Sequence, residues 1–341
     1  MVIDSDFEVF VVHANCRAIK GANRIAIYDL NGKIFLLDKS NEELVDRVFS
    51  RNHVSRKEMS LSSELLSMCN FLEGKKLGIW THPEIADSLS PINFNYVPPT
   101  IITNSVIDIV GEEKYYQKFI IELAELNCPF VQIRFYPTTD LKVVKEIAEC
   151  IQVNELPSVQ FLIPYANIDS FFSEINQLVL QNSRISEIIV YGLPQQLAKP
   201  MNGLSQIIKT TTDSFTNSND CGCIGSQYFI PSVEFFNESL KYNNCLNRKI
   251  SLTTDGFLKN CPSLPLNYGH ITNTSLIDVV HTNEFQFWWH IKKDDIKICN
   301  KCEFRYMCSD CRAFTIDSKD IYSKPAKCNY DPIILNKNEQ E

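Results

Sequence analysis

Four cysteines lie within thirteen residues near the carboxyl end of the chain, in the segment CNKCEFRYMCSDC that runs from Cys299 to Cys311. Thiolates bind zinc ions and iron–sulfur clusters, and a turn with two residues between its cysteines aims both sulfurs at one point. Nine of the 13 cysteines fall between Cys221 and Cys328. This density predicts that any metal chemistry of the protein lies in the last third of the chain.

The other four cysteines stand alone in the sequence. Isolated cysteines are often buried, where they pack as small hydrophobic side chains. They are therefore predicted to lie in the core and to bind no metal. These residues are Cys16, Cys69, Cys128 and Cys150.

No export or membrane segment is predicted. The first 16 residues carry acids where a signal peptide needs basic residues, and no run of roughly 18 apolar residues occurs. We expect a cytoplasmic protein without a membrane partner, in which reducing conditions disfavour a disulfide framework. The formal net charge of −8 argues against sequence-independent binding of nucleic acid.

The spacing of the cysteines leaves two kinds of metal site open. Five residues separate Cys302 from Cys308, whereas the two halves of a zinc ribbon usually stand roughly a dozen or more residues apart. An iron–sulfur cluster is larger than one ion and tolerates a wider reach with a distant fourth ligand. The spacing therefore favours iron–sulfur, with zinc as the alternative.

The cysteines also follow a recognisable order. A cysteine pair that encloses a glycine comes first, a group of four follows after a gap, and one cysteine closes the series. This order resembles the SPASM domain, which is appended to radical S-adenosylmethionine (radical SAM) enzymes and holds auxiliary [4Fe–4S] clusters. The chain departs from that pattern in having two residues, not three, between Cys308 and Cys311. The residues that carry the resemblance are Cys245, Gly256, Cys261, Cys299, Cys302, Cys308, Cys311 and Cys328.

The resemblance implies two [4Fe–4S] clusters. The ligands implied for one cluster are Cys299, Cys302, Cys308 and Cys328. The ligands implied for the other are Cys245, Cys261 and Cys311, with a fourth cysteine upstream of Cys245. Cys221 and Cys223 are both candidates for that fourth ligand, and Cys221 is preferred.

Basic residues surround the dense cysteine segment. They either offset the negative charge of thiolate-ligated clusters or dock an acidic part of a peptide. These residues are Lys297, Lys301, Arg305 and Arg312.

Residues 1–94 are predicted to form a small α+β module. Two strand-like runs flank Asn31-Gly32, a strong signal for a two-residue hairpin. Helices over 41–49 and 62–74 and a strand over 75–81 follow, which suggests a winged-helix-like unit. Such a unit often leaves a sheet edge that accepts an extended peptide.

Residues 95–220 alternate apolar strand-like runs with amphipathic helical segments, which predicts βαβ units and a parallel sheet. Four or five units fit, enough for a partial barrel or an open α/β sheet. Residues 221–341 lose this period, apart from one predicted helix over 274–291, and metal ligation is expected to stabilise them.

The α/β segment resembles the radical SAM partial barrel. In those enzymes three closely spaced cysteines bind a cluster and leave one iron free to bind SAM, and this chain lacks such cysteines. No SAM binding is expected. Together with the SPASM cysteines, this resembles the SPASM-domain protein of grasp-with-spasm systems. That resemblance implies maturation of a ribosomally synthesised precursor with a Gly-Gly leader, alongside an ATP-grasp ligase. The alternative is a non-enzymatic adaptor with structural metal sites that presents the precursor. No catalytic residue is singled out.

Overall fold

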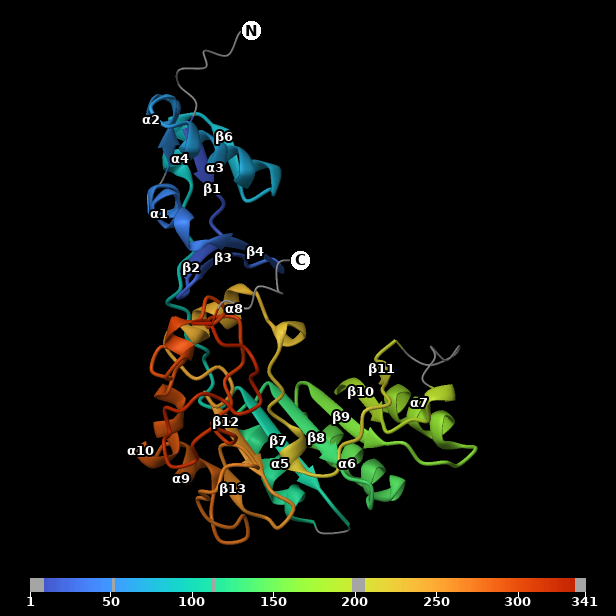
Figure 1. Ribbon diagram of the computed structural model, residues 1–341. Coiled ribbons are helices and arrows are strands. Elements are labelled where there is room, and N and C mark those ends of the chain that lie inside the picture. The colour runs from blue at the N-terminus through green and yellow to red at the C-terminus, as the bar shows by residue number, and fades with distance from the viewer. Residues whose placement is uncertain (1–8, 51–52, 112–113, 198–205, 335–341) are drawn as a thin grey trace.

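The computed structural model describes residues 9–50, 53–111, 114–197 and 206–334. An N-terminal module forms the upper end of a column, the cysteine-rich part forms the lower end, and a large sheet extends sideways from the base (Figure 1). The predicted lack of a signal peptide concerns the first 16 residues, of which 1–8 lie outside the described ones. In the described part of the chain, no helix combines the length and apolar character needed to cross a membrane.

Two small sheets form the N-terminal module, with strand orders β5-β1-β6 and β2-β3-β4. The first consists of β1 (Val9–Val12), β5 (Val54–Ser55) and β6 (Gly78–Thr81). The second consists of β2 (Cys16–Lys20), β3 (Arg24–Asp29) and β4 (Lys33–Asp38). The helices are α1 (Glu42–Phe49), α2 (Arg56–Ser60), α3 (Ser63–Gly74) and α4 (Pro83–Ser88). One apolar core joins the two sheets to α1 and α3.

The predicted hairpin is confirmed, but its loop is longer than expected. Strands β3 and β4 pair with Asp29 opposite Lys33, so three residues form the connection. Gly32 has a φ of +118°, and its N–H donates to the Asp29 carbonyl oxygen at 2.9 Å. Asn31 also donates its backbone N–H to the Asp29 carboxylate at 3.0 Å, which stabilises the longer turn. The helices predicted over 41–49 and 62–74 and the strand over 75–81 are confirmed as α1, α3 and β6.

A seven-stranded, mainly parallel sheet confirms the predicted α/β fold, with strand order β11-β10-β9-β8-β7-β12-β13. Its parallel strands are β7 (Asn104–Ile109), β8 (Phe130–Phe135), β9 (Val159–Pro164), β10 (Ile185–Tyr191), β11 (Ile208–Thr210) and β12 (Lys249–Leu252). The short β13 (Leu258–Lys259) pairs antiparallel with β12. The helices between the strands are α5 (Tyr115–Glu125), α6 (Leu141–Val153) and α7 (Phe171–Gln181).

The three helices cover one face of this sheet. In β8, Val131, Ile133 and Phe135 are fully buried in the core that the helices share, because alternate residues of a strand point to the same side. In α6, Val144 and Ile147 belong to the buried stripe, at the spacing of a helix that packs on one side. The opposite face of the sheet carries polar side chains and is called the open face below.

A row of polar side chains crosses four strands on the open face. The side-chain amide of Gln132 donates to the side-chain Oε1 of Gln160 at 2.6 Å, and the Gln160 amide nitrogen donates in turn to the carboxylate of Glu187. Glu187 forms an ion pair with Lys209 on β11. These residues satisfy one another without an additional layer of helices.

The large sheet extends across the predicted boundary at residue 220. Strand β12, from the cysteine-rich part, pairs parallel with β7, so that Ile250 lies opposite Ser105. Ile250 and Trp289 also belong to the same core as the helices of the α/β segment. The two predicted parts therefore share one sheet and one core.

The prediction of a single helix over 274–291 is wrong. The segment divides into α9 (Leu276–Val280), α10 (Asn283–Gln286) and a 3-10 turn over Phe287–His290. Thr282 adopts an extended conformation, and its hydroxyl accepts a hydrogen bond from the Phe285 N–H at 3.2 Å. A threonine in this position begins a new helix rather than continuing the previous one.

Candidate functional site

The structure brings four of the predicted ligands together in what we call the first thiol group. Its members are Cys221, Cys245, Cys261 and Cys311. Burial raises the pKa of Cys261 to about 12, and negative charge on Cys245 and Cys221 adds to that shift. Burial also raises the pKa of Cys311, with contributions from the same two neighbours. Four thiols from segments far apart in the sequence thus lie within electrostatic reach of one another.

The other four predicted ligands form the second thiol group. Its members are Cys299, Cys302, Cys308 and Cys328. Burial raises the pKa of Cys299 to about 11, and charge on Cys308 and Cys328 contributes in the same direction. Burial is also the largest cause of the raised pKa of Cys302, to which Cys308 and Cys299 add. Each group brings together the residues of one implied ligand set, and the ligation itself stays a prediction.

Tight turns position the second thiol group. Ile298 has a φ of +69°, and a 3-10 turn over Cys299–Lys301 follows it. The Cys302 N–H donates to the Cys299 carbonyl oxygen at 2.9 Å, which closes the turn. The Phe304 N–H points at the sulfur of Cys302 at 3.4 Å, a contact that stabilises negative charge on that sulfur.

The loop that carries Cys221 approaches Cys311 very closely. Gly222 has a φ of +82°, and a Cβ atom there would lie 2.9 Å from the Cys311 sulfur. Only glycine permits both the backbone angle and this approach. Lys327, next to the second-group ligand Cys328, donates to the Asn219 carbonyl oxygen at 2.6 Å and also to that of Cys221. This contact links the loop to the last cysteine segment.

Cys221 and Cys223, the two candidates for the eighth ligand, have different surroundings. Charge on Cys221 affects the pKa of Cys261 and Cys311, which places it in the first thiol group. Both residues are exposed, and the sulfur of Cys223 lies 3.9 Å from the Asp220 carbonyl oxygen. The choice of Cys221 as the eighth ligand stays a prediction.

The donor sets fit iron–sulfur clusters. Each thiol group contains four cysteines, the usual ligand set of a [4Fe–4S] cluster. In the part of the chain that the structure describes, no three His, Cys, Asp or Glu side chains could hold one metal ion. A bound cluster would supply one-electron chemistry.

The isolated cysteines lie where the sequence predicts. Cys16, Cys69 and Cys128 are buried, and Cys150 is half-buried against the main core. Burial raises the pKa of Cys69 to about 11, so its thiol stays protonated at neutral pH.

Each thiol group has a lysine beside it that sequence reasoning missed. Lys249 is half-buried, and its ammonium lies 3.5 Å from the sulfur of Cys245. Lys293 is 3% exposed, and its positive charge partly offsets the rise that burial causes in the pKa of Cys299 and Cys308. These positive charges stabilise thiolates. Neither lysine belongs to the dense cysteine segment, so no local pattern singles them out.

The basic residues selected from the sequence have different roles. Arg305 pairs with Asp294 at 3.1 Å and donates to the Lys20 carbonyl oxygen at 2.9 Å, which ties the N-terminal module to the cysteine-rich part. Lys297 forms an exposed pair with Asp320. Arg312 is buried, and Asp310 is its partner.

Asp310 is a buried hub between the two thiol groups. It is 1% exposed and accepts a hydrogen bond from Arg312 at 2.7 Å. Its carboxylate also lies 3.3 Å from the Lys293 ammonium, on the side of the second group. On the side of the first group, Asn243 donates to Asp310 at 2.7 Å and accepts the N–H of Cys245 at 3.0 Å. One carboxylate therefore connects the surroundings of both groups.

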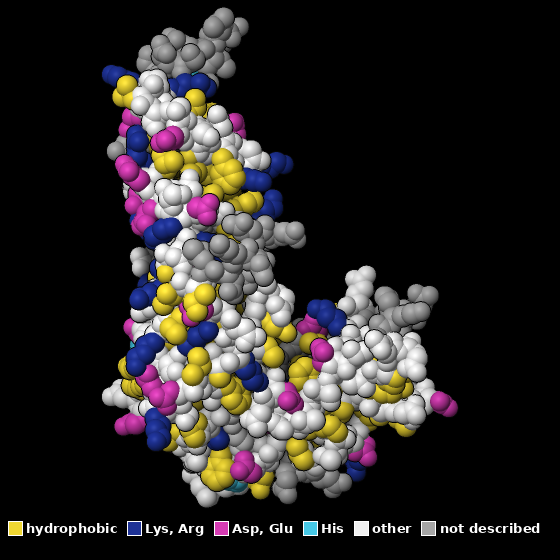
Figure 2. Space-filling view, viewed as in Figure 1, with side chains coloured by type: hydrophobic (Ala, Val, Ile, Leu, Met, Phe, Trp, Pro, Cys, Tyr) yellow, Lys and Arg dark blue, Asp and Glu magenta, His cyan; other side chains and the backbone are white. Residues whose placement is uncertain are grey.

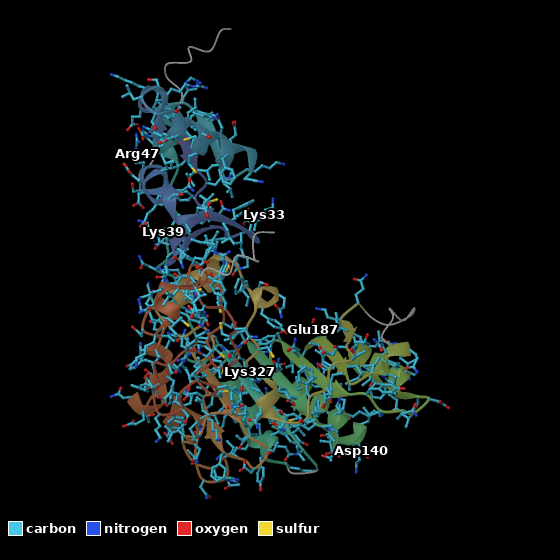
Figure 3. The ribbon with its side chains drawn as sticks, viewed as in Figure 1. Lys33, Lys39, Arg47, Asp140, Glu187 and Lys327 are labelled. Atoms are coloured by element: carbon cyan, nitrogen blue, oxygen red, sulfur yellow. The ribbon has the colours of Figure 1, made fainter. Side chains whose placement is uncertain are left out.

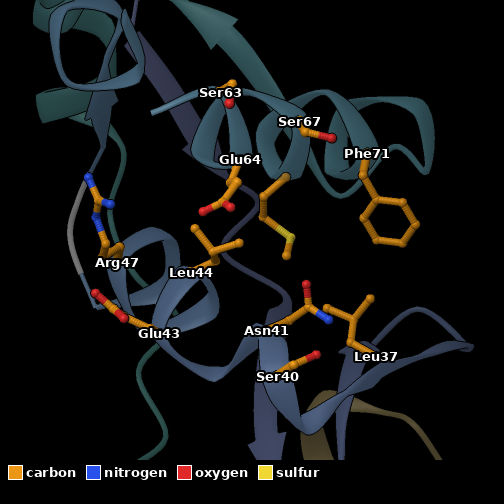
Figure 4. Close-up of a pocket in the computed structure, with 11 residues that line it drawn as sticks. Leu37, Ser40, Asn41, Glu43, Leu44, Arg47, Ser63, Glu64, Ser67 and Phe71 are labelled. Carbon is orange, nitrogen blue, oxygen red and sulfur yellow. The ribbon is translucent and has the colours of Figure 1, made fainter. Parts of the chain in front are cut away.

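A groove of about 700 Å³ opens in the N-terminal module, between the β4 edge and helices α1 and α3 (Figure 4). Its apolar floor includes Leu37, Leu44 and Phe71. Its rim is polar, with Ser67 and Arg47 among the residues that line it. Within the described residues, β4 pairs only with β3, so its other edge is available for hydrogen bonding.

Comparisons with known proteins give no family assignment. No family model matches the chain, and no curated protein matches it. Three crystal structures of SuiB from Streptococcus suis are similar over 94% of this chain and 100% of theirs. The TM-scores are 0.38 at 11% identity, 0.35 at 12% for SuiB bound to S-adenosylmethionine, and 0.33 at 11% for SuiB bound to the precursor peptide SuiA. At these values the likeness carries no argument about function, and the SPASM resemblance stays a prediction.

Proposed function

We propose that this chain takes part in the maturation of a ribosomally synthesised peptide, and that its two thiol groups each hold a [4Fe–4S] cluster. The observation that supports this most strongly is the partition of eight cysteines into two groups of four, from five separate stretches of sequence. The partner enzyme is an ATP-grasp ligase, as the grasp-with-spasm resemblance implies. Bound clusters would supply one-electron chemistry, with electrons taken from an external reductant and passed to the precursor or the partner enzyme, in place of SAM cleavage.

The groove of the N-terminal module is the proposed site for the Gly-Gly leader. An extended peptide that adds to a sheet edge gains main-chain hydrogen bonds, and pockets beside the edge select its side chains. Strand β4 supplies such an edge, and the apolar floor formed by Leu37 and Phe71 lies beside it (Figure 4).

The substitution Ser67→Arg tests this leader site. Ser67 lines the groove and is exposed, so the long charged side chain is expected to obstruct the peptide without disturbing the core. We expect the affinity for the leader peptide encoded with this chain to fall at least about tenfold, measured by calorimetry. Asn70→Arg, on an exposed position of α3 that does not line the groove, is the matched control. Equal binding by both variants would exclude this groove.

Anaerobic purification tests the proposed clusters. We expect a brown protein with broad absorption near roughly 400 nm and about eight iron and eight sulfide per chain, as two four-iron clusters require. A colourless protein with stoichiometric zinc would replace this proposal with the structural-zinc alternative.

An adaptor is the second candidate function, favoured by the absence of the SAM-binding cysteine triplet from the sequence. In that case the clusters stabilise the fold and take no part in redox chemistry. Reduction with dithionite followed by re-oxidation separates the two candidates. Reversible cycling of the folded protein supports electron transfer, whereas loss of the fold on reduction leaves only the adaptor.

A further inference from the structure

A small pocket lies where the open face of the large sheet meets the segment that leads to Cys221. Its volume is about 190 Å³, below the range of roughly 300–1,000 Å³ typical of whole small-molecule ligands. Figure 2 shows the hollow between the column and the sheet, and Figure 3 labels Glu187 and Lys327 on its two sides. The pocket has room for a single side chain.

The pocket wall is mainly apolar and aromatic. Leu162 and Tyr191 contribute from β9 and β10, and Phe215 closes one side. The rings of Tyr191 and Phe215 pack edge to face, with centroids 5.2 Å apart. The Tyr191 hydroxyl donates to the Phe135 carbonyl oxygen at 2.7 Å, so it needs no hydrogen bond from an occupant of the pocket.

The charged groups at the pocket neutralise one another. Arg134 lines the pocket, but it binds the Asp108 carboxylate through two hydrogen bonds of 2.6 and 2.9 Å. Asp108 is 4% exposed, so this pair is shielded from solvent. Burial, followed by the negative charge of Asp108, raises the pKa of Tyr136, whose hydroxyl therefore stays neutral at physiological pH. Because Asp108 already occupies Arg134, a charged occupant would find no opposite charge free to pair with it and would lose its hydration.

The pocket also touches a predicted cluster ligand. Cys221 lines it and belongs to the first thiol group, and its charge reaches Arg134 on the opposite wall. An occupant would therefore sit beside the proposed cluster, separated from it only by the ligand's own side chain.

We propose that this pocket binds one uncharged aromatic or branched apolar side chain of the peptide and holds it against the first thiol group. This inference rests on the proposed function, which it extends by naming the class of residue presented. The leader groove would bind one part of the precursor and the pocket another.

The probe for this pocket is N-acetyl-phenylalaninamide, compared with N-acetyl-alaninamide and N-acetyl-lysinamide. We expect the phenylalanine derivative to bind at least about tenfold more tightly than either, because the pocket removes its aromatic side chain from water. Ligand-observed NMR on the anaerobically purified full chain measures the affinities. Leu162→Trp, which fills the pocket, is expected to abolish binding.

Two further variants complete the experiment. Leu180→Trp makes the same change on an 84% exposed position of α7 and should bind the probe like wild type. Phe215→Ala removes a wall ring from a loop, and its loss of binding provides the test if Leu162→Trp fails to fold. No preference for the phenylalanine derivative, or binding that survives in folded Leu162→Trp or Phe215→Ala, would overturn the proposal. The iron and sulfide content is measured in parallel, so a failure of the pocket is distinguished from a failure of the proposed clusters.

Discussion

Replacing Cys302 with alanine is expected to remove the cluster of the second thiol group and to leave that of the first. Cys302 is half-buried; burial raises its pKa, and charge on nearby Cys308 and Cys299 adds to the rise. Anaerobically purified Cys302→Ala should contain about half the iron and sulfide of wild type. Because ligation contributes directly to folding, the cysteine-rich part should also unfold at a lower denaturant concentration.

Cys69→Ala is the matched control, since it also removes one thiol. Cys69 is fully buried in the N-terminal core and lies in neither thiol group. Its iron content should equal that of wild type, although loss of core packing can lower stability. Equal iron loss in the two variants would show that the division between core cysteines and ligands is wrong.

Asp310→Ala is expected to disturb both clusters, although Asp310 is not a ligand. The substitution leaves Lys293 and Arg312 buried without their shared carboxylate. Breaking a buried charge network by removing one partner typically costs about 3–5 kcal/mol. We expect a loss of this size in anaerobic denaturant unfolding. The iron content should also fall below that of Cys302→Ala. Asn243 loses its hydrogen bond to Asp310, and Asn243 is the residue that accepts the backbone N–H of Cys245.

Asp320→Ala provides the comparison for this hub. Asp320 also pairs with a lysine in the same part of the chain, but its ion pair with Lys297 is exposed to solvent. Exposed pairs contribute little, so stability and iron content should remain close to wild type. Asp310→Asn keeps a side chain of the same size that can form hydrogen bonds, but it removes the charge. Its stability and iron content should lie between those of wild type and Asp310→Ala. Wild-type iron and stability in Asp310→Ala would refute the proposed role of the hub.

Much of the α/β architecture was predictable because it depends on local patterns. The strand-like runs ending in Phe135 and Tyr191 alternate with amphipathic helices, and such alternation favours a parallel sheet. The hairpin followed from Asn31-Gly32, but its loop length did not, because side-chain bonding by Asp29 extended the turn. The helix predicted over 274–291 failed for a similar local reason, since Thr282 capped a new helix.

The sequence alone determined which cysteines stand isolated and which belong to a ligand-like series, since spacing along the chain is a one-dimensional property. It also determined the alternation that gives the large sheet. Only the tertiary structure decided that β12 joins this sheet, that Lys249 and Lys293 lie beside the thiols, and that Asp310 connects both groups. It alone assembled the pocket beside Cys221, from residues of four separate segments. These features depend on contacts between segments tens to hundreds of residues apart, which packing of the whole chain selects and which no local pattern encodes.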